Sequence, residues 1–122
     1  MTDAAPSSTG GSAGGAYLAW DVHWREAPDD NRWTRPEPQV VDILPLLRDR
    51  GVRRVLDLGS GLGRHSLLLA AEGYEVVGVD ASPAGLQRSR GWTRPGTKAT
   101  FVLADMRDLP FDDETFDYVL DE

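Results

Sequence analysis

The chain has 122 residues, which gives room for one small domain, and 40% of them are hydrophobic, which is enough for a core. It has no cysteine, which excludes disulfides and thiolate metal sites, and its two histidines are too few for a histidine-rich metal site. No apolar run approaches the roughly 20 residues of a membrane span, and no secretory signal pattern is visible. We therefore expect a soluble cytoplasmic protein.

The net charge of −7 is concentrated near one end of the chain. Residues 105–122 hold eight acids and one base, whereas the other 104 residues hold twelve acids and twelve bases. A phosphate backbone would be repelled by the acidic end, and no basic stripe compensates. Nucleic acid is therefore not an expected partner, and we expect the acidic run to be a solvated loop rather than a partner-binding tail.

The N-terminal part divides into two segments. Residues 1–15 are almost entirely Ser, Gly, Ala, Thr and Pro, a composition typical of a disordered lead-in. Residues 16–36 are rich in aromatic side chains. Within them Tyr17, Trp20 and Trp24 have the spacing of one helix face, and a loop is expected to follow.

Residues 37–122 alternate between helical and extended patterns and form the expected domain. Pro38 can open a helix that ends near Gly51, and Pro45 should kink or split it. The elements expected after it are strand 52–58, helix 63–71, strand 74–79, helix 82–90, strand 99–104 and the start of a strand at 116–120. This alternation predicts an α/β fold, a Rossmann-like open parallel sheet with flanking helices.

The most informative segment is 55–63, where a buried strand leads into a glycine-rich turn and a helix follows. The glycines are spaced as G-x-G-x-G at Gly59, Gly61 and Gly63, and Asp57 precedes the first by two residues. Without a Cβ, these positions allow a sharp turn and a close approach of the backbone to a ligand. Their simpler alternative role is a tight turn alone.

A second acid completes a nucleotide-handling pattern. Asp80 ends the next apolar strand, so the order is strand, glycine turn, helix, strand and acid, which is the ground plan of a nucleotide-binding βαβ unit. The dinucleotide fingerprint places its third small residue where this chain has Arg64. A nicotinamide-dependent oxidoreductase is therefore the less favoured interpretation.

An acid two residues before G-x-G-x-G resembles motif I of the class I S-adenosylmethionine-dependent methyltransferases. Residues 76–80 resemble the second-strand motif of that family, 104–106 the third, and 117–120 the start of the fourth. The similarity extends from about Val40 to the last residue. It implies the first four strands of a seven-stranded sheet ordered 3-2-1-4-5-7-6, and so the N-terminal, cofactor-binding portion of a domain incomplete at its C-terminus.

The resemblance also implies how S-adenosylmethionine would bind, without a metal. Asp57 would meet the methionyl amino group, Asp80 the two ribose hydroxyls and Asp105 the adenine amino group. Met106 would offer a soft face to the ring, and Ala81 would leave room beside it. The cofactor-binding residues implied are Asp57, Gly59, Ser60, Gly61, Gly63, Asp80, Ala81, Asp105 and Met106.

Several of these residues have a simpler alternative role. Asp80 could serve the start of the helix that follows it, and Asp105 could belong only to the solvated acidic loop. Arg64 could approach an anionic group or lie in solvent at a helix start, and His65 fits packing better than a base. The aromatic residues of 16–36 resemble a cap over the cofactor in several such families, or they pack the first helix onto the sheet.

The reaction implied is transfer of the sulfonium methyl group to a small-molecule acceptor by in-line displacement, helped by alignment of the reactants. No catalytic residue can be named, because a base and the acceptor pocket would normally come from beyond the fourth strand. The alternatives are a fragment that binds the cofactor without catalysis, or half of a split enzyme. An open fourth-strand edge predicts a C-terminal half or a partner chain that covers it.

Overall fold

The computed structural model describes residues 13–112 and 115–121, with side chains from residue 18 onward within those ranges. Within them, four parallel strands form a sheet in the order β3-β2-β1-β4. The strands are β1 (Arg54–Leu58), β2 (Glu75–Asp80), β3 (Lys98–Leu103) and β4 (Tyr118–Asp121). Their order and direction confirm the expected Rossmann-like open parallel sheet.

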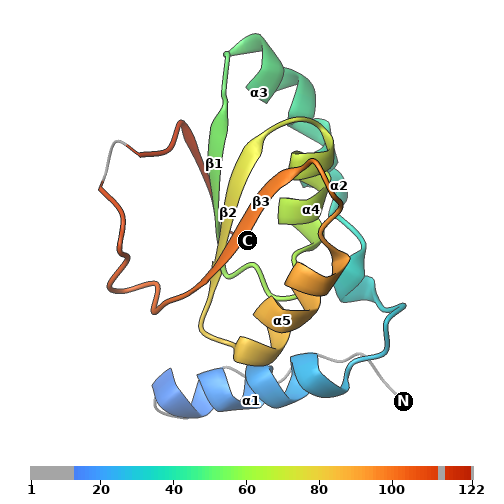
Figure 1. Cartoon of the computed structure of the whole chain (residues 1–122), viewed down its shortest axis with the longest axis vertical. Coiled ribbons are helices and arrows are strands. Elements are labelled where there is room, and N and C mark those ends of the chain that lie inside the picture. The colour runs from blue at the N-terminus through green and yellow to red at the C-terminus, as the bar shows by residue number, and fades with distance from the viewer. Residues whose placement is uncertain (1–12, 113–114, 122) are drawn as a thin grey trace.

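One face of the sheet is covered by helices (Figure 1). These are α2 (Pro38–Asp42), α3 (Leu44–Asp49), α4 (Arg64–Ala71) and α5 (Pro83–Trp92). α2 and α3 occupy the single helix expected after Pro38, and the split confirms the effect expected of Pro45, which lies in the first turn of α3. Proline fits there because the first N–H groups of a helix have no intrahelical partner.

The hydrophobic core lies between this face and the helices. Val55 of β1 pairs in register with Val76 of β2, so both side chains point to the same face. The buried cluster consists of Val40, Leu47, Val55, Leu69, Ala70, Tyr74, Val76 and Leu120. Burial of apolar surface at roughly 25 cal/mol per Å² is the main force that fixes the helices on the sheet.

The first helix stands apart from this layer. α1 (Ala13–Glu26) lies across the N-terminal end of α5, and a short 3₁₀ helix, η1 (Arg32–Thr34), follows it (Figure 1). α1 begins within the segment expected to be a lead-in, while residues 1–12 lie outside the described part of the chain. The helix therefore extends further toward the N-terminus than the aromatic pattern indicates.

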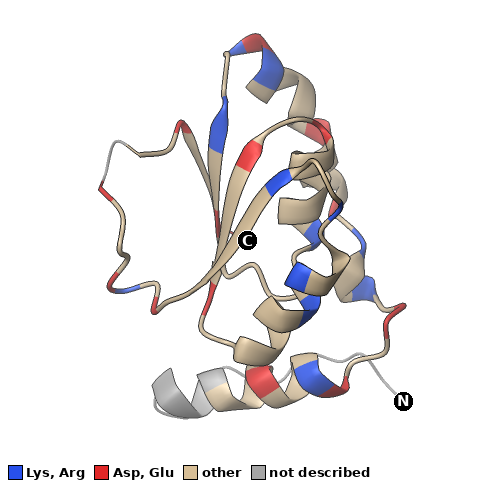
Figure 2. Ribbon diagram, in the orientation of Figure 1, with Lys and Arg blue, Asp and Glu red and all other residues tan. Residues whose placement is uncertain are grey.

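The loop between β3 and β4 carries most of the acidic run. Figure 2 shows acidic positions spread along it, and most of its described side chains are exposed. One acid is not simply solvated: the Asp117 carboxylate accepts hydrogen bonds from the backbone N–H groups of Arg53 and Arg54, each at 2.9 Å. These bonds tie the end of the loop to the start of β1.

No helix in the described part of the chain has the length and apolar content to cross a membrane.

Candidate cofactor site

The carboxyl ends of β1, β2 and β3 open onto one cavity of about 750 Å³. This is the edge at which ligands bind in open α/β sheets. The cavity brings together all of the residues implied by motif resemblance except Gly63. Its lining consists of Trp20, Trp24, Trp33, Glu37, Asp57, Gly59, Ser60, Gly61, Leu62, Arg64, His65, Asp80, Ala81, Asp105, Met106 and Arg107.

The glycine turn is fastened to the end of β2. The backbone N–H groups of Gly59 and Ser60 donate to the Val79 carbonyl at 2.8 and 3.0 Å. Gly61 has φ +54°, and a Cβ there would lie 3.0 Å from the Trp24 ring. Glycine at this position thus allows both the left-handed backbone and the close approach of the aromatic ring.

Gly63 serves packing rather than the cavity. It caps the start of α4 with φ +83°, and a Cβ there would lie 2.8 Å from the Ser89 hydroxyl of α5. Its side-chain-free surface lets α4 begin directly against α5. The structure places Gly63 behind the site, unlike the other glycines of the motif.

Asp57 is the most deeply buried acid of the cavity, with 2% of its surface exposed. Burial raises the pKa of this carboxyl to about 6, despite a 2.6 Å hydrogen bond donated by the Ser66 hydroxyl. A buried carboxylate without a cation is costly, and a cationic ligand would restore its charge. Asp57 is therefore suited to an ammonium group.

Asp80 lies at the end of β2, and its carboxylate accepts hydrogen bonds from nearby backbone N–H groups. One oxygen accepts the Gly61 N–H at 2.8 Å and the other accepts the Ser82 N–H at 2.9 Å. Burial raises the pKa of the carboxyl, whereas these bonds lower it. A carboxylate has about four acceptor sites, so Asp80 keeps acceptor capacity for a ligand hydroxyl. The bond to Ser82 shows that the helix-start role and the ligand role are compatible.

Asp105 is exposed and forms an ion pair with Arg107. The Arg107 guanidinium contacts both of its oxygens, at 2.6 to 3.1 Å, and this interaction lowers the pKa of the Asp105 carboxyl to about 2. Contact with an adenine amino group would require Arg107 to release one oxygen. Met106 is 51% exposed at the cavity wall, and its sulfur lies 3.8 Å from the Cβ position of Gly59.

His65 and Arg64 line the cavity, and both form hydrogen bonds with Glu37. His65 accepts the Glu37 N–H at Nε2, at 3.1 Å, and burial lowers the pKa of the imidazole to about 4. Arg64 pairs with the Glu37 carboxylate at 2.9 Å and lies over the Trp33 ring. The neutral, hydrogen-bonded His65 fits the packing role, and Arg64 is held by Glu37 and Trp33 rather than extending into solvent.

The aromatic residues form one side of the cavity. The Trp20 and Trp24 rings stack with centroids 4.8 Å apart, and Trp33 meets each of them edge-on at 5.6 Å. Trp33, Glu37, Leu62 and Arg107 are lining residues that motif reasoning missed. The aromatic richness of 16–36 was the available signal for Trp33.

A buried hydroxyl without a hydrogen-bond partner in the described part of the chain indicates that the cavity suits a polar ligand. The Ser60 hydroxyl is buried in the cavity wall, and its oxygen has no hydrogen-bond partner among the described residues. Such a group is expected to find a partner, and a bound ligand can supply it. With two acids, a free hydroxyl and aromatic rings, the cavity fits S-adenosylmethionine. The described part of the chain contains no cluster of three or more metal-ligating side chains.

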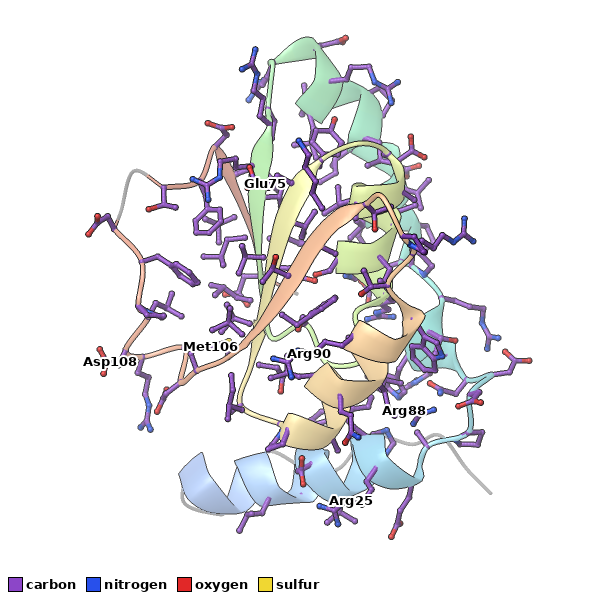
Figure 3. The ribbon with its side chains drawn as sticks, viewed as in Figure 1. Arg25, Glu75, Arg88, Arg90, Met106 and Asp108 are labelled. Carbon is purple, nitrogen blue, oxygen red and sulfur yellow. The ribbon has the colours of Figure 1, made fainter. Side chains whose placement is uncertain are left out.

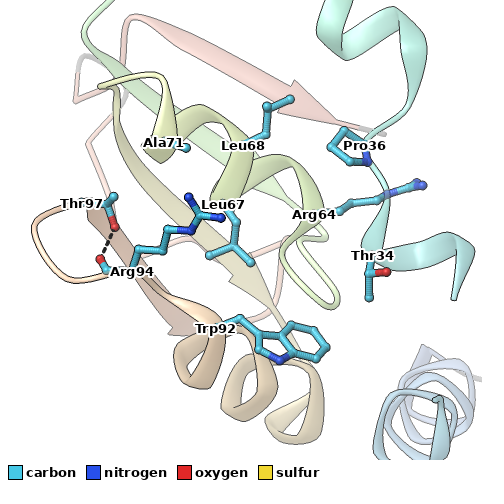
Figure 4. A pocket seen from close by; sticks show the side chains of 9 residues that line it. All are labelled: Thr34, Pro36, Arg64, Leu67, Leu68, Ala71, Trp92, Arg94 and Thr97. Atoms are coloured by element: carbon cyan, nitrogen blue, oxygen red, sulfur yellow. Dashed lines mark hydrogen bonds between the residues drawn. The ribbon is translucent and has the colours of Figure 1, made fainter. Parts of the chain in front are cut away.

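A second cavity of about 280 Å³ lies on the outer side of α4 and contains none of these acids (Figure 4). Arg64 is the residue common to both cavities. The lining is Thr34, Pro36, Arg64, Leu67, Leu68, Ala71, Trp92, Arg94 and Thr97. The larger cavity remains the candidate site, because the second one holds none of the residues implied by the motif resemblance.

A family model described as a methyltransferase domain matches residues 55–121. The chain belongs to the methyltransferase domain family. This match confirms the resemblance to class I S-adenosylmethionine-dependent methyltransferases. A demethylmenaquinone methyltransferase of Clavibacter sepedonicus is 46% identical over 66 residues, which are 54% of this chain and 27% of that protein.

Solved structures of methyltransferases share this fold. A chain from work on conversion of a disulfide bond into a thioacetal group during echinomycin biosynthesis gives a TM-score of 0.71 at 32% identity, over 87% of this chain and 46% of that one. Magnesium protoporphyrin IX methyltransferase from Synechocystis PCC 6803, solved with bound S-adenosylhomocysteine, gives 0.59 at 26% identity, over 68% and 40%. The chain thus spans less than half the length of these proteins.

Proposed function

We propose that this chain binds S-adenosylmethionine and forms the cofactor-binding part of a methyltransferase for a small-molecule acceptor. The observation that carries the proposal is the convergence of Asp57 and Asp80 on one cavity beside the glycine turn. Asp57 is a desolvated carboxylate suited to an ammonium group, and Asp80 keeps acceptor capacity for the hydroxyls of a ribose.

S-adenosylmethionine would supply an activated sulfonium methyl group. The residues of this chain would bind and orient it: Asp57 through the methionyl ammonium, Asp80 through the ribose, and Met106 beside the adenine ring. Trp20 and Trp24 would exclude water from the same cavity. Rate enhancement would then come mainly from alignment of donor and acceptor.

Two relatives support the proposed class of acceptor. The names of demethylmenaquinone methyltransferase and magnesium protoporphyrin IX methyltransferase specify small-molecule acceptors, and both support the same class here. Because the chain spans under half of each, we propose that the acceptor-binding part lies outside these residues, in a longer protein or a partner chain. That part would cover β4. A cytoplasmic location remains a prediction from sequence.

The test is calorimetric titration of the chain with S-adenosylhomocysteine. We expect binding that is lost in Asp80→Ala and kept in Asp49→Ala, which removes an exposed acid of α3. NAD should not compete. Absence of binding by a chain that circular dichroism shows to be folded would overturn the proposal. Binding without methyl transfer, even with the acceptor-binding part supplied, would favour a non-catalytic cofactor-binding role.

A further inference from the structure

The helix α1 contributes a wall of the cavity without belonging to the sheet or its helical layer. It supplies Trp20 and Trp24, and it packs on α5 (Figure 1). Trp24 is buried against the glycine turn, because its ring lies within 3.5 Å of the Cβ positions of both Gly61 and Gly85. The position of this wall therefore depends on what fixes α1 to α5.

A buried acid fixes the middle of α1. Asp21 is 7% exposed, and its Oδ1 accepts the Ser82 hydroxyl at 2.7 Å and the Ala84 N–H at 3.0 Å. Both donors belong to the start of α5. Although burial opposes the charge, hydrogen bonds from Ala84 and Ser82 and the nearby Arg25 lower the pKa of this carboxyl. Asp21 thus acts as a charged cap on a neighbouring helix.

A half-buried arginine of α5, Arg88, fixes the C-terminal end of α1. Arg88 donates from Nη1 to the Trp24 and Ala27 carbonyls, each at 2.7 Å, and pairs through Nη2 with Asp29 at 2.7 Å. Figure 3 shows Arg88 between α5 and the end of α1, whereas Arg25 lies on the far side of α1. The two helices are therefore fastened at two points, and at both of them α5 supplies the donors while α1 and the residues just after it supply the acceptors.

Ser82 joins this attachment to the cofactor carboxylate. Its hydroxyl donates to Asp21, and its N–H donates to Asp80. The same hydroxyl accepts the Gly85 N–H and so caps α5 itself. Ser82 thereby connects Asp21 of α1 to Asp80 at the end of β2, because it donates a hydrogen bond to each of them.

We propose that Asp21 and Arg88 are positioning residues of the cofactor site, which hold Trp20 and Trp24 at the cavity and align Ser82 with Asp80. The role rests on the proposed function, because the wall matters only if the cavity binds a ligand. Neither residue lines the cavity, so both act through the side chains they hold.

The test compares variants in the full chain by two readouts: affinity for S-adenosylhomocysteine, and hydrogen exchange of the α1 amides without ligand. We expect Asp21→Ala to raise the Kd roughly tenfold and to speed α1 exchange, as loss of hydrogen bonds to a charged group would. Asp21→Asn keeps an acceptor oxygen and should restore most of the affinity. Arg25→Ala removes only the exposed partner of Asp21 and is the matched control.

Arg88→Met keeps an apolar side chain without its donors and should reproduce the effects of Asp21→Ala from the other end of α1. If Asp21→Ala does not fold, Arg88→Met alone tests whether the attachment of α1 to α5 positions the cofactor site. Unchanged exchange and affinity in Arg88→Met, with a wild type that binds, would overturn the inference alone. A folded wild type that binds no S-adenosylhomocysteine would instead overturn the proposed function, and the positioning role with it.

Discussion

The burial of the charged Asp57 carboxylate in the cavity lowers the stability of the fold at neutral pH. Its pKa of about 6 in the folded chain exceeds the ordinary value of 3.8, so the folded state holds the proton more tightly than the unfolded state. Stability from this group is present below about pH 4 and is lost as the pH rises through 6. At neutral pH the buried charge therefore weakens the fold until a cation pairs with it.

Asp57→Asn should for this reason raise the free energy of unfolding at pH 7 by about 3 kcal/mol. The asparagine oxygen can still accept the Ser66 hydroxyl, so packing is retained. Urea denaturation gives the stability, and titration with S-adenosylhomocysteine should show weakened binding. Asp49→Asn is the exposed control. A destabilised Asp57→Asn would contradict the burial argument.

His65 should act on stability in the opposite direction. Its pKa of about 4 in the folded chain lies below the ordinary 6.5, so its contribution is present above pH 6.5 and is lost as the pH falls toward 4. As the pH falls over much of the same range, protonation of Asp57 increases the stability of the fold and opposes the effect of His65. In Asp57→Asn the His65 trend stands alone, and urea midpoints should fall more steeply with acid than in wild type. Equal slopes in both proteins would refute this.

Sequence predicted best those residues whose type is dictated by local backbone and position. Gly61 and Asp80 were located because a left-handed turn and a strand end leave a readable pattern. Glu37 could not be assigned, because it reaches the cavity through its contact with His65, which is distant in sequence. Arg107 was missed since nothing in the sequence shows that it binds Asp105.

At the scale of elements, α5 offers a matched pair of glycines. A Cβ at Gly85 would lie 2.8 Å from the Gly61 carbonyl oxygen, whereas nothing lies within 4 Å of one at Gly91. Gly85 is thus required for α5 to approach the glycine turn, although from sequence it reads only as a weak point of the helix. Gly91 has no such constraint.

We expect Gly85→Ala to destabilise the chain by about 1–3 kcal/mol, because the helix or the turn must move. Gly91→Ala should instead stabilise it by about 0.5–1 kcal/mol, because alanine loses less conformational freedom in a helix. Thermal unfolding measures both. If the two variants shift the midpoint in the same direction, the contact with Gly61 does not limit α5.

Strands and most helices followed from sequence because their signals are local. Apolar runs set β1 and β2, and Pro45 separated α2 from α3 as expected. The start of α1 at Ala13 was not foreseen, because Ala and Gly show no amphipathic pattern. Its attachment through Asp21 and Arg88 joins residues about 60 positions apart, which no periodicity records.

Within the described residues, β3 and β4 form the two edges of the sheet. β4 pairs only with β1 among the described strands, and Val119 on it is 50% exposed. Leu103 and Met106, at the end of β3 and just beyond it, are exposed as well. An exposed apolar edge strand is a site of association between chains.

Val119→Lys should therefore reduce self-association of the chain, because a charge on an edge strand opposes pairing with another edge. Leu46→Lys, at a position 47% exposed on α3, is the control and should have little effect. Sedimentation velocity at several concentrations measures the change. A wild type that stays monomeric at all of them would show that β4 does not recruit a second strand.

Under the proposed function, the Asp80 carboxylate would let the site discriminate between sugars. Backbone N–H donors orient the group, and its remaining acceptor capacity suits the hydroxyl donors of a ribose. A 2′-deoxy analogue of S-adenosylhomocysteine would leave one lone pair desolvated and unpaired, at a cost of about 1–3 kcal/mol. The chain should thus reject deoxynucleosides about ten- to hundredfold, through a penalty on the wrong ligand rather than extra attraction for the right one.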